Sequence, residues 1–177
     1  MFALIGTLIQ QFLVPISLSD SSKSQELIVE EKRVELVRQS ADEQAELVAQ
    51  AQSYLESQNS PLAKVTPHIL AKKHWRLIIG ISAIESQFCT RKLYLNCWGI
   101  GGDFAYRHYP TLEAGVDDVD ALISHWQAKG KWLTPRAMNC SYVVPCNENW
   151  VKTVNSVISD LDAIVQRTTG APKNNAL

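Results

Sequence analysis

Glu85 is the residue whose type and position most clearly suggest acid–base chemistry. It lies near the end of the strongly apolar segment IIGISAIESQF. A carboxylate whose neighbours exclude water is costly to keep ionised, so its pKa is expected to rise. Glycosidases use a carboxyl group of this kind, still protonated near neutral pH, to donate a proton to a leaving sugar oxygen. On these grounds alone, however, an ordinary exposed glutamate at a helix end is the more common case.

The four cysteines form two local couples, Cys89 with Cys97 and Cys140 with Cys146. An even number in this arrangement suits two short-loop disulfides, although the sequence alone does not fix the pairing. Disulfides persist in oxidising compartments, so they indicate an extracytoplasmic location. The alternative is a zinc site, but zinc clusters usually have cysteines about two to four residues apart, and both gaps here are wider.

Other reactive side chains give weaker signals. The histidines are scattered and lack the paired spacing of a zinc site: His68, His74, His108 and His125. We therefore expect no metal and no cofactor. His108 or His125 could serve as the base for a cysteine nucleophile, but cysteines paired in disulfides cannot act as nucleophiles.

The segments around Glu85 have the periodicity of helices. Residues 67–73 and 75–88 are predicted to be helical, the second one buried on most sides. Ser60-Pro61 and Thr66-Pro67 both place an N-capping side chain before a proline, which favours a helix start. The stretch 89–110 is rich in glycine and aromatic residues and is predicted to be a loop.

Two further helices are expected after this loop. Thr111 can cap a helix that continues to about Lys129, and either Cys146 or Asn149 marks the start of a last helix that continues to about Arg167. No strand-length alternating segment of any strength appears. The predicted fold class is therefore mainly α, with a long N-terminal helix before the main domain.

The N-terminal third has a different composition from the rest. Residues 1–19 contain no charged side chain and are mostly apolar, which is typical of a signal peptide or membrane anchor. Residues 20–59 are predicted to form a helical stalk, residues 60–167 the main domain and residues 168–177 a polar tail. A basic n-region and an evident cleavage site are missing, which slightly favours an uncleaved anchor.

The predicted stalk carries an apolar residue at every seventh position: Leu27, Val34, Ala41, Val48 and Leu55. Val37 and Ala51 fill some of the matching positions three residues further on, whereas Gln44 and Gln58 do not. The pattern could mean self-association in a coiled coil. A helix that packs its stripe on its own domain gives the same pattern, and the sequence does not separate the two.

Three motifs beyond Glu85 carry a resemblance to a known superfamily. AIESQF is followed by NCWGIGG, then by YRHYPTLEAGVDDVDALI, and later by SYVVPCNENWVKTVNSVI. In this order the motifs resemble those of the peptidoglycan glucosaminidases and lytic transglycosylases of the lysozyme superfamily. The resemblance covers most of residues 75–161 and implies a lysozyme-like helical domain.

The resemblance also implies roles for individual residues. Glu85 matches the catalytic acid, and Tyr142 matches a late tyrosine that lies near the acid in the active site. The remaining matches, implied to contact substrate, are Ser86, Asn96, Trp98, Gly99, Ile100, Tyr106 and Tyr109. An indole can stack on a sugar ring and an amide can bond its hydroxyl groups. Core packing for Trp98, loop anchoring for Tyr106 and Tyr109, and a structural hydroxyl for Tyr142 are the alternatives.

A second catalytic carboxylate is not evident. The resembled glucosaminidases commonly have a longer segment after Gly-Ile that supplies an additional acid, whereas here GGDFA intervenes and Asp103 is its one acid. Asp117, Asp118 and Asp120 fall on the following predicted helix, where exposure to solvent is the simpler explanation. Lytic transglycosylases need only one acid, because the 6-hydroxyl of the muramic acid closes a 1,6-anhydro ring. The short loop therefore favours transglycosylase-type cleavage over hydrolysis.

The expected partner is thus the glycan strand of bacterial peptidoglycan, in the cell envelope. The N-terminal segment would add contact with a membrane, or the protein would be secreted. The formal net charge of −1 and the lack of a basic cluster argue against nucleic acid as a partner. A glycan-binding or scaffold protein that keeps the fold without activity is the alternative, and the enzymatic interpretation requires a sugar-sized groove beside Glu85.

Overall fold

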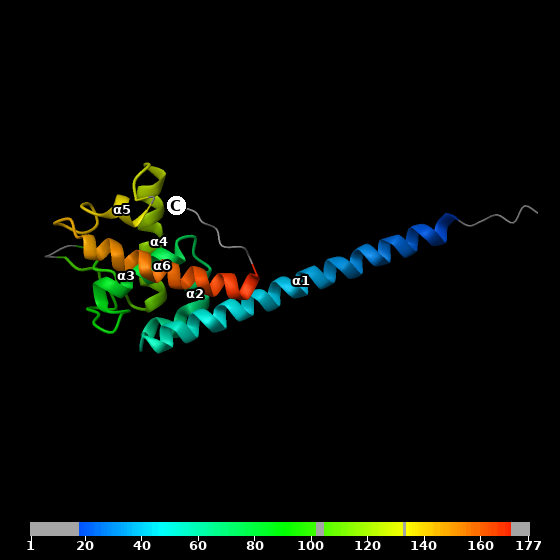
Figure 1. Ribbon diagram of the computed structural model, residues 1–177, viewed down its shortest axis with the longest axis horizontal. Helices are drawn as coiled ribbons and strands as arrows, with labels where there is room; N and C mark the ends of the chain where they lie inside the picture. Colours follow the sequence, from blue (N-terminus) through cyan, green and yellow to red (C-terminus); the bar gives the residue numbers. More distant parts are fainter. Residues whose placement is uncertain (1–17, 102–104, 133, 171–177) are drawn as a thin grey trace, which may run out of the picture. The chain divides into compact units, whose positions relative to one another are not determined.

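The computed structural model describes residues 18–101, 105–132 and 134–170 (Figure 1). Their regular structure is helical, and no β-strand occurs within these ranges, although two isolated bridges join Leu93 to Asn96 and Asn139 to Val143. The helices are α1 (Leu18–Ser57), η1 (Pro61–Val65), α2 (Thr66–Leu70), α3 (Trp75–Ser86), α4 (Leu112–Ala128), α5 (Pro135–Met138) and α6 (Glu148–Thr169). The mainly α fold class is confirmed, while the lysozyme-like arrangement stays a prediction.

The chain divides into two compact units, residues 1–41 and 42–177. The predicted stalk ended at residue 59, but the part of α1 from Asp42 onward belongs to the second unit. Most of the predicted anchor, residues 1–17, lies outside the described residues, as do residues 171–177 of the predicted tail. None of the helices in the described ranges combines the length and the apolar character needed to cross a membrane.

The heptad stripe of α1 has two different environments. In the first unit, Leu27, Val34 and Val37 are exposed. In the second unit, Ala51 and Leu55 are fully buried in the core. The C-terminal part of the stripe therefore packs on its own domain, which is one of the two alternatives that the sequence left open, and a coiled coil through the N-terminal part stays a prediction.

Helices α3 and α6 form the centre of the second unit, where they lie side by side (Figure 1). Their close approach depends on Gly80, because a Cβ atom at this position would lie 3.1 Å from Cγ1 of Val154. Apolar side chains from both helices fill the core around this contact, including Ile78, Ile79, Ile81, Trp150, Val154 and Leu161. The end of α3 is thereby fixed against the first turns of α6.

The capping residues agree with the sequence in part. Ser60 and Thr111 cap η1 and α4 with their side chains, as predicted. Thr66 is not the N-cap of α2 but its first residue, and its hydroxyl donates to the carbonyl oxygen of Ala63 at 2.9 Å. The predicted helix over residues 67–73 is correspondingly short, because α2 ends at Leu70.

The other helix ends also differ from the prediction. Asn147, not Cys146 or Asn149, caps α6, because its side chain accepts hydrogen bonds from two backbone amides of the first turn. Helix α5, capped by Thr134, falls in a stretch that was not predicted to be helical. Helix α3 ends at Ser86, two residues early, because Gln87, Phe88 and Cys89 have φ angles of 50°, 55° and 68°. The backbone thus reverses directly after Glu85.

Candidate active site

Glu85 lies in the last turn of α3 and is anchored from α6. The residue as a whole is exposed, but its Oε1 atom accepts a hydrogen bond of 2.7 Å from Nε1 of Trp150. Trp150 is buried in the first turn of α6, so the donor is fixed. The other carboxylate oxygen lies against the backbone of Gly99, where a Cβ atom would be 3.1 Å from Oε2. The carboxylate is therefore held by protein while part of the side chain remains accessible.

The surroundings of Glu85 favour its protonated form. Burial raises the pKa of Glu85 above its ordinary value, and the hydrogen bond from Trp150 lowers it by less. This is the direction expected for a carboxyl group that loses water on one side. Trp150 acts against the rise because an N–H donor stabilises the ionised form more than the neutral form.

Tyr142 lies beside this carboxyl group. Its hydroxyl donates a hydrogen bond to the carbonyl oxygen of Trp98. Burial raises the pKa of Tyr142 well above its ordinary value, and the negative charges of Glu85 and Tyr109 add to this effect. Glu85, Tyr109 and Tyr142 therefore share one neighbourhood, as the motifs implied. Tyr142 stays neutral at physiological pH, and its hydroxyl proton is used in the hydrogen bond to Trp98.

An aromatic row leads to Glu85 through Tyr142. The ring centroids of Trp126 and Trp132 are 5.3 Å apart, those of Trp132 and Tyr142 are 5.3 Å apart, and those of Tyr142 and Trp150 are 5.6 Å apart. Trp132 and Trp150 are buried, whereas Trp126 and Tyr142 are only partly so. The row rigidly supports the Trp150 indole that contacts Glu85.

The loop after α3 is held together by Asn96. The side-chain amide donates to the carbonyl oxygens of Ile100 at 2.7 Å and Arg107 at 3.3 Å. Its Oδ1 atom accepts from the backbone amides of Trp98 at 3.3 Å and Ile100 at 3.1 Å. Asn96 is buried and its donors and acceptor are occupied within the loop, so its predicted contact with sugar is wrong for this structure.

Trp98 belongs to the core rather than to a groove. It is fully buried, and its indole N–H donates to the carbonyl oxygen of Ile78 at 2.8 Å. Its ring packs so closely against α4 that a Cβ atom at Gly115 would lie 2.7 Å from it. The predicted stacking of Trp98 on a sugar ring is therefore wrong, and core packing is the alternative that the structure supports. Ile100 is also buried.

Ser86 has a structural role as well. Its buried hydroxyl donates to the carbonyl oxygen of Cys97 at 2.7 Å and accepts from the amide of Cys89 at 3.0 Å. It thus joins the end of α3 to the loop that contains Gly99. A direct contact of Ser86 with substrate is not compatible with this burial. Ser86 instead helps to position Gly99 beside Glu85.

The two tyrosines before α4 differ in accessibility. Tyr106 is exposed and free to contact a ligand. Tyr109 is half-buried, and its hydroxyl donates to Oδ2 of Asp118 at 2.5 Å. Burial and then Asp118 raise the pKa of Tyr109. Since Arg107 also pairs with Asp118 at 2.5 Å, the loop is anchored to α4 through this carboxylate, which the sequence had suggested to be simply exposed.

The other acids near the loop have partners of their own. Asp117 pairs with Lys72 at 2.5 Å and with His68 at 2.8 Å, and Asp120 accepts from the backbone amide of His74 at 3.0 Å. Asp103 lies outside the described residues. A second carboxylate poised opposite Glu85 is therefore not evident among the residues that the structure describes.

The predicted disulfides are present as two local pairs, Cys89–Cys97 and Cys140–Cys146. All four cysteines of the sequence are thereby used, and no free cysteine remains. A cysteine nucleophile is excluded. The first bridge closes a loop that begins at Cys89, four residues after Glu85, and the second follows the short helix α5 and closes a loop that contains Tyr142.

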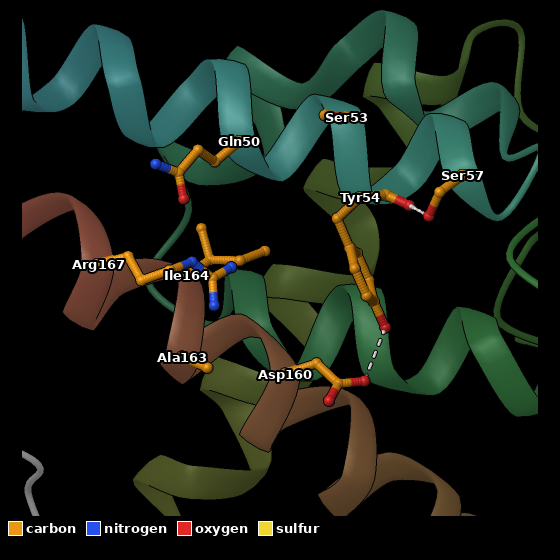
Figure 2. Close-up of a pocket in the computed structure, with 8 residues that line it drawn as sticks. All are labelled: Gln50, Ser53, Tyr54, Ser57, Asp160, Ala163, Ile164 and Arg167. Carbon is orange, nitrogen blue, oxygen red and sulfur yellow. Dashed lines mark hydrogen bonds between the residues drawn. The ribbon is translucent and has the colours of Figure 1, made fainter.

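The sugar-sized groove that the enzymatic interpretation requires beside Glu85 stays a prediction. A hollow of about 450 Å³ lies elsewhere, between α1 and α6 (Figure 2), and none of its lining residues is among those implied by the motifs. Beside Glu85, which is itself exposed, Gly99 is also exposed.

Trp150 is the residue that sequence reasoning missed. Its signal was present, because a tryptophan in the first turn of an amphipathic helix is commonly buried and its N–H group then needs an acceptor. The sequence does not show that the acceptor is a carboxylate 65 positions earlier.

Comparison of the chain with models of protein families, with curated proteins and with solved structures gives no match.

Proposed function

We propose that this protein is a peptidoglycan glycosidase in which Glu85 is the single general acid and base. The observation that carries the proposal is the setting of its carboxyl group. Burial raises its pKa, a buried indole fixes one oxygen, the other oxygen lies against Gly99, and the residue as a whole remains exposed. A carboxyl group that is both protonated and accessible is what proton donation to a glycosidic oxygen needs.

The reaction can proceed with one carboxyl group. Glu85 gives its proton to the bridging oxygen, the bond from the anomeric carbon to that oxygen breaks, and the leaving sugar departs with the electron pair. The resulting carboxylate then takes the proton from the hydroxyl that attacks the anomeric carbon. In lytic-transglycosylase-type cleavage this hydroxyl is the 6-hydroxyl of the same muramic acid, and in N-acetylglucosaminidase-type cleavage it belongs to water. Trp150 positions Glu85 through both steps.

The single-acid setting favours the transglycosylase-type reaction. A hydrolase needs a second carboxylate within about 5–10 Å of the first to act as nucleophile or to activate water. Three acids of α4, Asp117, Asp118 and Asp120, are engaged by Lys72, Arg107 and the amide of His74. An internal nucleophile on the substrate removes the need for such a group.

The test is digestion of purified peptidoglycan by the wild type and by Glu85→Gln. We expect released muropeptides with 1,6-anhydro ends from the wild type and none from the variant. Hydrolysis would give reducing ends, which are heavier by one water in mass spectrometry. Glu56→Gln, which changes an exposed carboxylate on α1, is the matched control and should retain activity. Equal release by wild type and Glu85→Gln would refute the proposal.

A non-catalytic glycan-binding or scaffold protein is the second candidate. The observation that favours it is the burial of Asn96 and Trp98, which leaves fewer sugar-contacting groups than the motifs imply. In this case the wild type and Glu85→Gln would both sediment with peptidoglycan, and neither would release fragments. The same digestion therefore separates the two candidates.

The location that goes with either candidate is the cell envelope. The two disulfides support an extracytoplasmic domain, because such bonds persist in oxidising compartments. Attachment to the membrane through residues 1–19 and self-association through the exposed part of the α1 stripe are proposals of the same kind. Fractionation of cells and measurement of the mass of the purified chain in solution test them.

A further inference from the structure

The hollow between α1 and α6 holds two opposite charges that do not neutralise each other. Asp160 and Arg167 both line it, both are exposed, and neither forms an ion pair within the described part of the chain. They are seven residues apart on α6, which is two turns, so they share a face but exceed the reach of an i, i+4 pair. Their backbone positions are about 10 Å apart along the helix axis.

The residues that line the space between these two charges suit an extended peptide chain. Ile164 lies between Asp160 and Arg167 on the same face of α6 and is almost fully buried, so it forms an apolar floor. On the opposite side, α1 contributes residues at the spacing of one helix face: Gln50, Ser53, Tyr54 and Ser57 (Figure 2). The hollow of about 450 Å³ is within the size range of sites for small ligands.

Polar groups on the α1 side remain available for a peptide backbone. The amide nitrogen of Gln50 donates to Glu46 at 2.7 Å, so its oxygen is left as an acceptor. The side-chain hydroxyl of Ser53 forms no hydrogen bond within the described residues. The hydroxyl of Tyr54 points across the hollow to Asp160, at 3.4 Å (Figure 2). Such a long hydrogen bond is easily exchanged for one to an ammonium group.

We propose that this hollow binds a short zwitterionic peptide of about three residues, with its amino terminus at Asp160 and its carboxylate at Arg167. An extended tripeptide spans about 10 Å, which matches the separation of the two charges along α6. The guanidinium group recognises a carboxylate through paired hydrogen bonds, and the aspartate recognises the ammonium group. The inference does not rest on the proposed glycosidase activity, since Glu85 takes no part in it.

The test is titration of the full chain with tri-L-alanine, followed by heteronuclear NMR. We expect binding on the order of millimolar affinity, with shifts confined to α1 and α6 around the hollow. Arg167→Gln and Asp160→Asn should each weaken binding by roughly fivefold, the upper end for a partly exposed pair. Lys152→Gln, which removes an exposed charge of α6 outside the hollow, is the matched control and should bind as the wild type does.

Capped peptides make the orientation testable. Amidation of the peptide carboxylate should weaken binding to the wild type by roughly fivefold but should not weaken binding to Arg167→Gln further. Acetylation of the amino group should behave in the same way towards Asp160→Asn. Dialanine should bind more weakly than the tripeptide. The proposal is overturned if tri-L-alanine causes no shifts around the hollow, or if free and doubly capped peptides bind equally well.

Discussion

Two carboxyl groups, that of Glu85 on α3 and that of Asp160 on α6, lie in contrasting settings. Near the start of the helix, the indole of Trp150 donates to Glu85 at 2.7 Å, and this carboxyl group lies against Gly99 in surroundings that raise its pKa. In the second half of the helix, Asp160 is exposed in an open hollow, where the Tyr54 hydroxyl lies 3.4 Å from its Oδ2 atom. One carboxyl group is suited to release a proton and the other to hold a positive charge.

The surroundings of a carboxyl group thus matter more than the element that carries it. Both groups have a tyrosine nearby, and in both cases burial is the largest cause of a raised tyrosine pKa. The pKa of Tyr54 rises to about 12, and that of Tyr142 rises well above its ordinary value. What differs is the buried aromatic row, which closes one side of the Glu85 site and has no counterpart in the lining of the hollow.

The largest expected effect separates the two sites. Glu85→Gln removes the transferable proton, so cleavage of peptidoglycan should fall by roughly a thousandfold, within the range for loss of a general acid. Tri-L-alanine binding at the hollow should stay within about twofold of the wild type. Muropeptide release and NMR titration of the same preparation measure both. A parallel loss at both sites would show that the substitution acts on the fold, and the distinction between the sites would fail.

A smaller effect should follow from Trp150→Phe. Removing the indole N–H takes away the interaction that lowers the pKa of Glu85, so this pKa should rise further. The alkaline limb of the pH profile of kcat/KM should then move to higher pH, and the rate at the optimum should fall about tenfold because the carboxyl group is no longer oriented. A shift of this limb to lower pH would contradict the assigned role of Trp150.

Trp132→Phe is the control for this change. Its indole N–H donates to Ser141 at 2.7 Å and not to Glu85, so the alkaline limb should stay in place whatever happens to the rate. The pair of variants tests a positioning role, because general loosening of the aromatic row would move both profiles alike.

A stability effect should follow from Gly115→Ala. The added Cβ atom would lie 2.7 Å from the buried Trp98 ring and 3.1 Å from the Tyr109 ring. Overpacking of this kind costs about 1–3 kcal/mol, of which the better helix propensity of alanine recovers up to about 1 kcal/mol. Thermal unfolding should therefore show a lower Tm. In a Trp98→Leu background the penalty should shrink, and an unchanged penalty there would show that Trp98 is not the obstacle.

The smallest expected effect is a pH-dependent gain of stability in Glu85→Gln. The folded protein holds the Glu85 proton more tightly than the unfolded chain does, because the folded pKa is raised. The stability associated with this proton is complete below about pH 4.3 and is lost as the pH rises through the higher folded pKa. The substituted glutamine does not titrate, so the variant should gain at most a few degrees in Tm at about pH 8 relative to the wild type, and less at about pH 4. An advantage that is greater at the lower pH would contradict the raised pKa.

Much of the fold was predictable because its signals are local. The apolar run of α3, the Thr111 cap of α4 and the two cysteine couples each depend on residues close together in the sequence. Helix α5 follows Thr134-Pro135, the same start signal that was recognised at Ser60-Pro61, so it could have been found. The early end of α3 could not, because non-glycine residues at positive φ have no clear sequence signature.

The surroundings of Glu85 could be predicted only in part. The motifs bring Glu85, Tyr109 and Tyr142 into one neighbourhood, as the structure has them. The motifs do not show which polar side chains already form hydrogen bonds within the protein. Asn96 and Ser86 have the chemistry of sugar-binding residues, yet their hydrogen bonds close a loop, and only the folded chain reveals that they are occupied.

The reversal after α3 lies between Glu85 and the Cys89–Cys97 disulfide. Each of Gln87, Phe88 and Cys89 adopts a left-handed backbone conformation, which costs an L-residue about 1–2 kcal/mol, so the turn persists only where other bonds enforce it. The disulfide between Cys89 and Cys97 is the covalent bond among those that enforce the turn. A newly made chain with free thiols lacks it, and its α3 terminus can relax away from Trp150. Formation of this bridge thus helps to hold Glu85 next to Trp150.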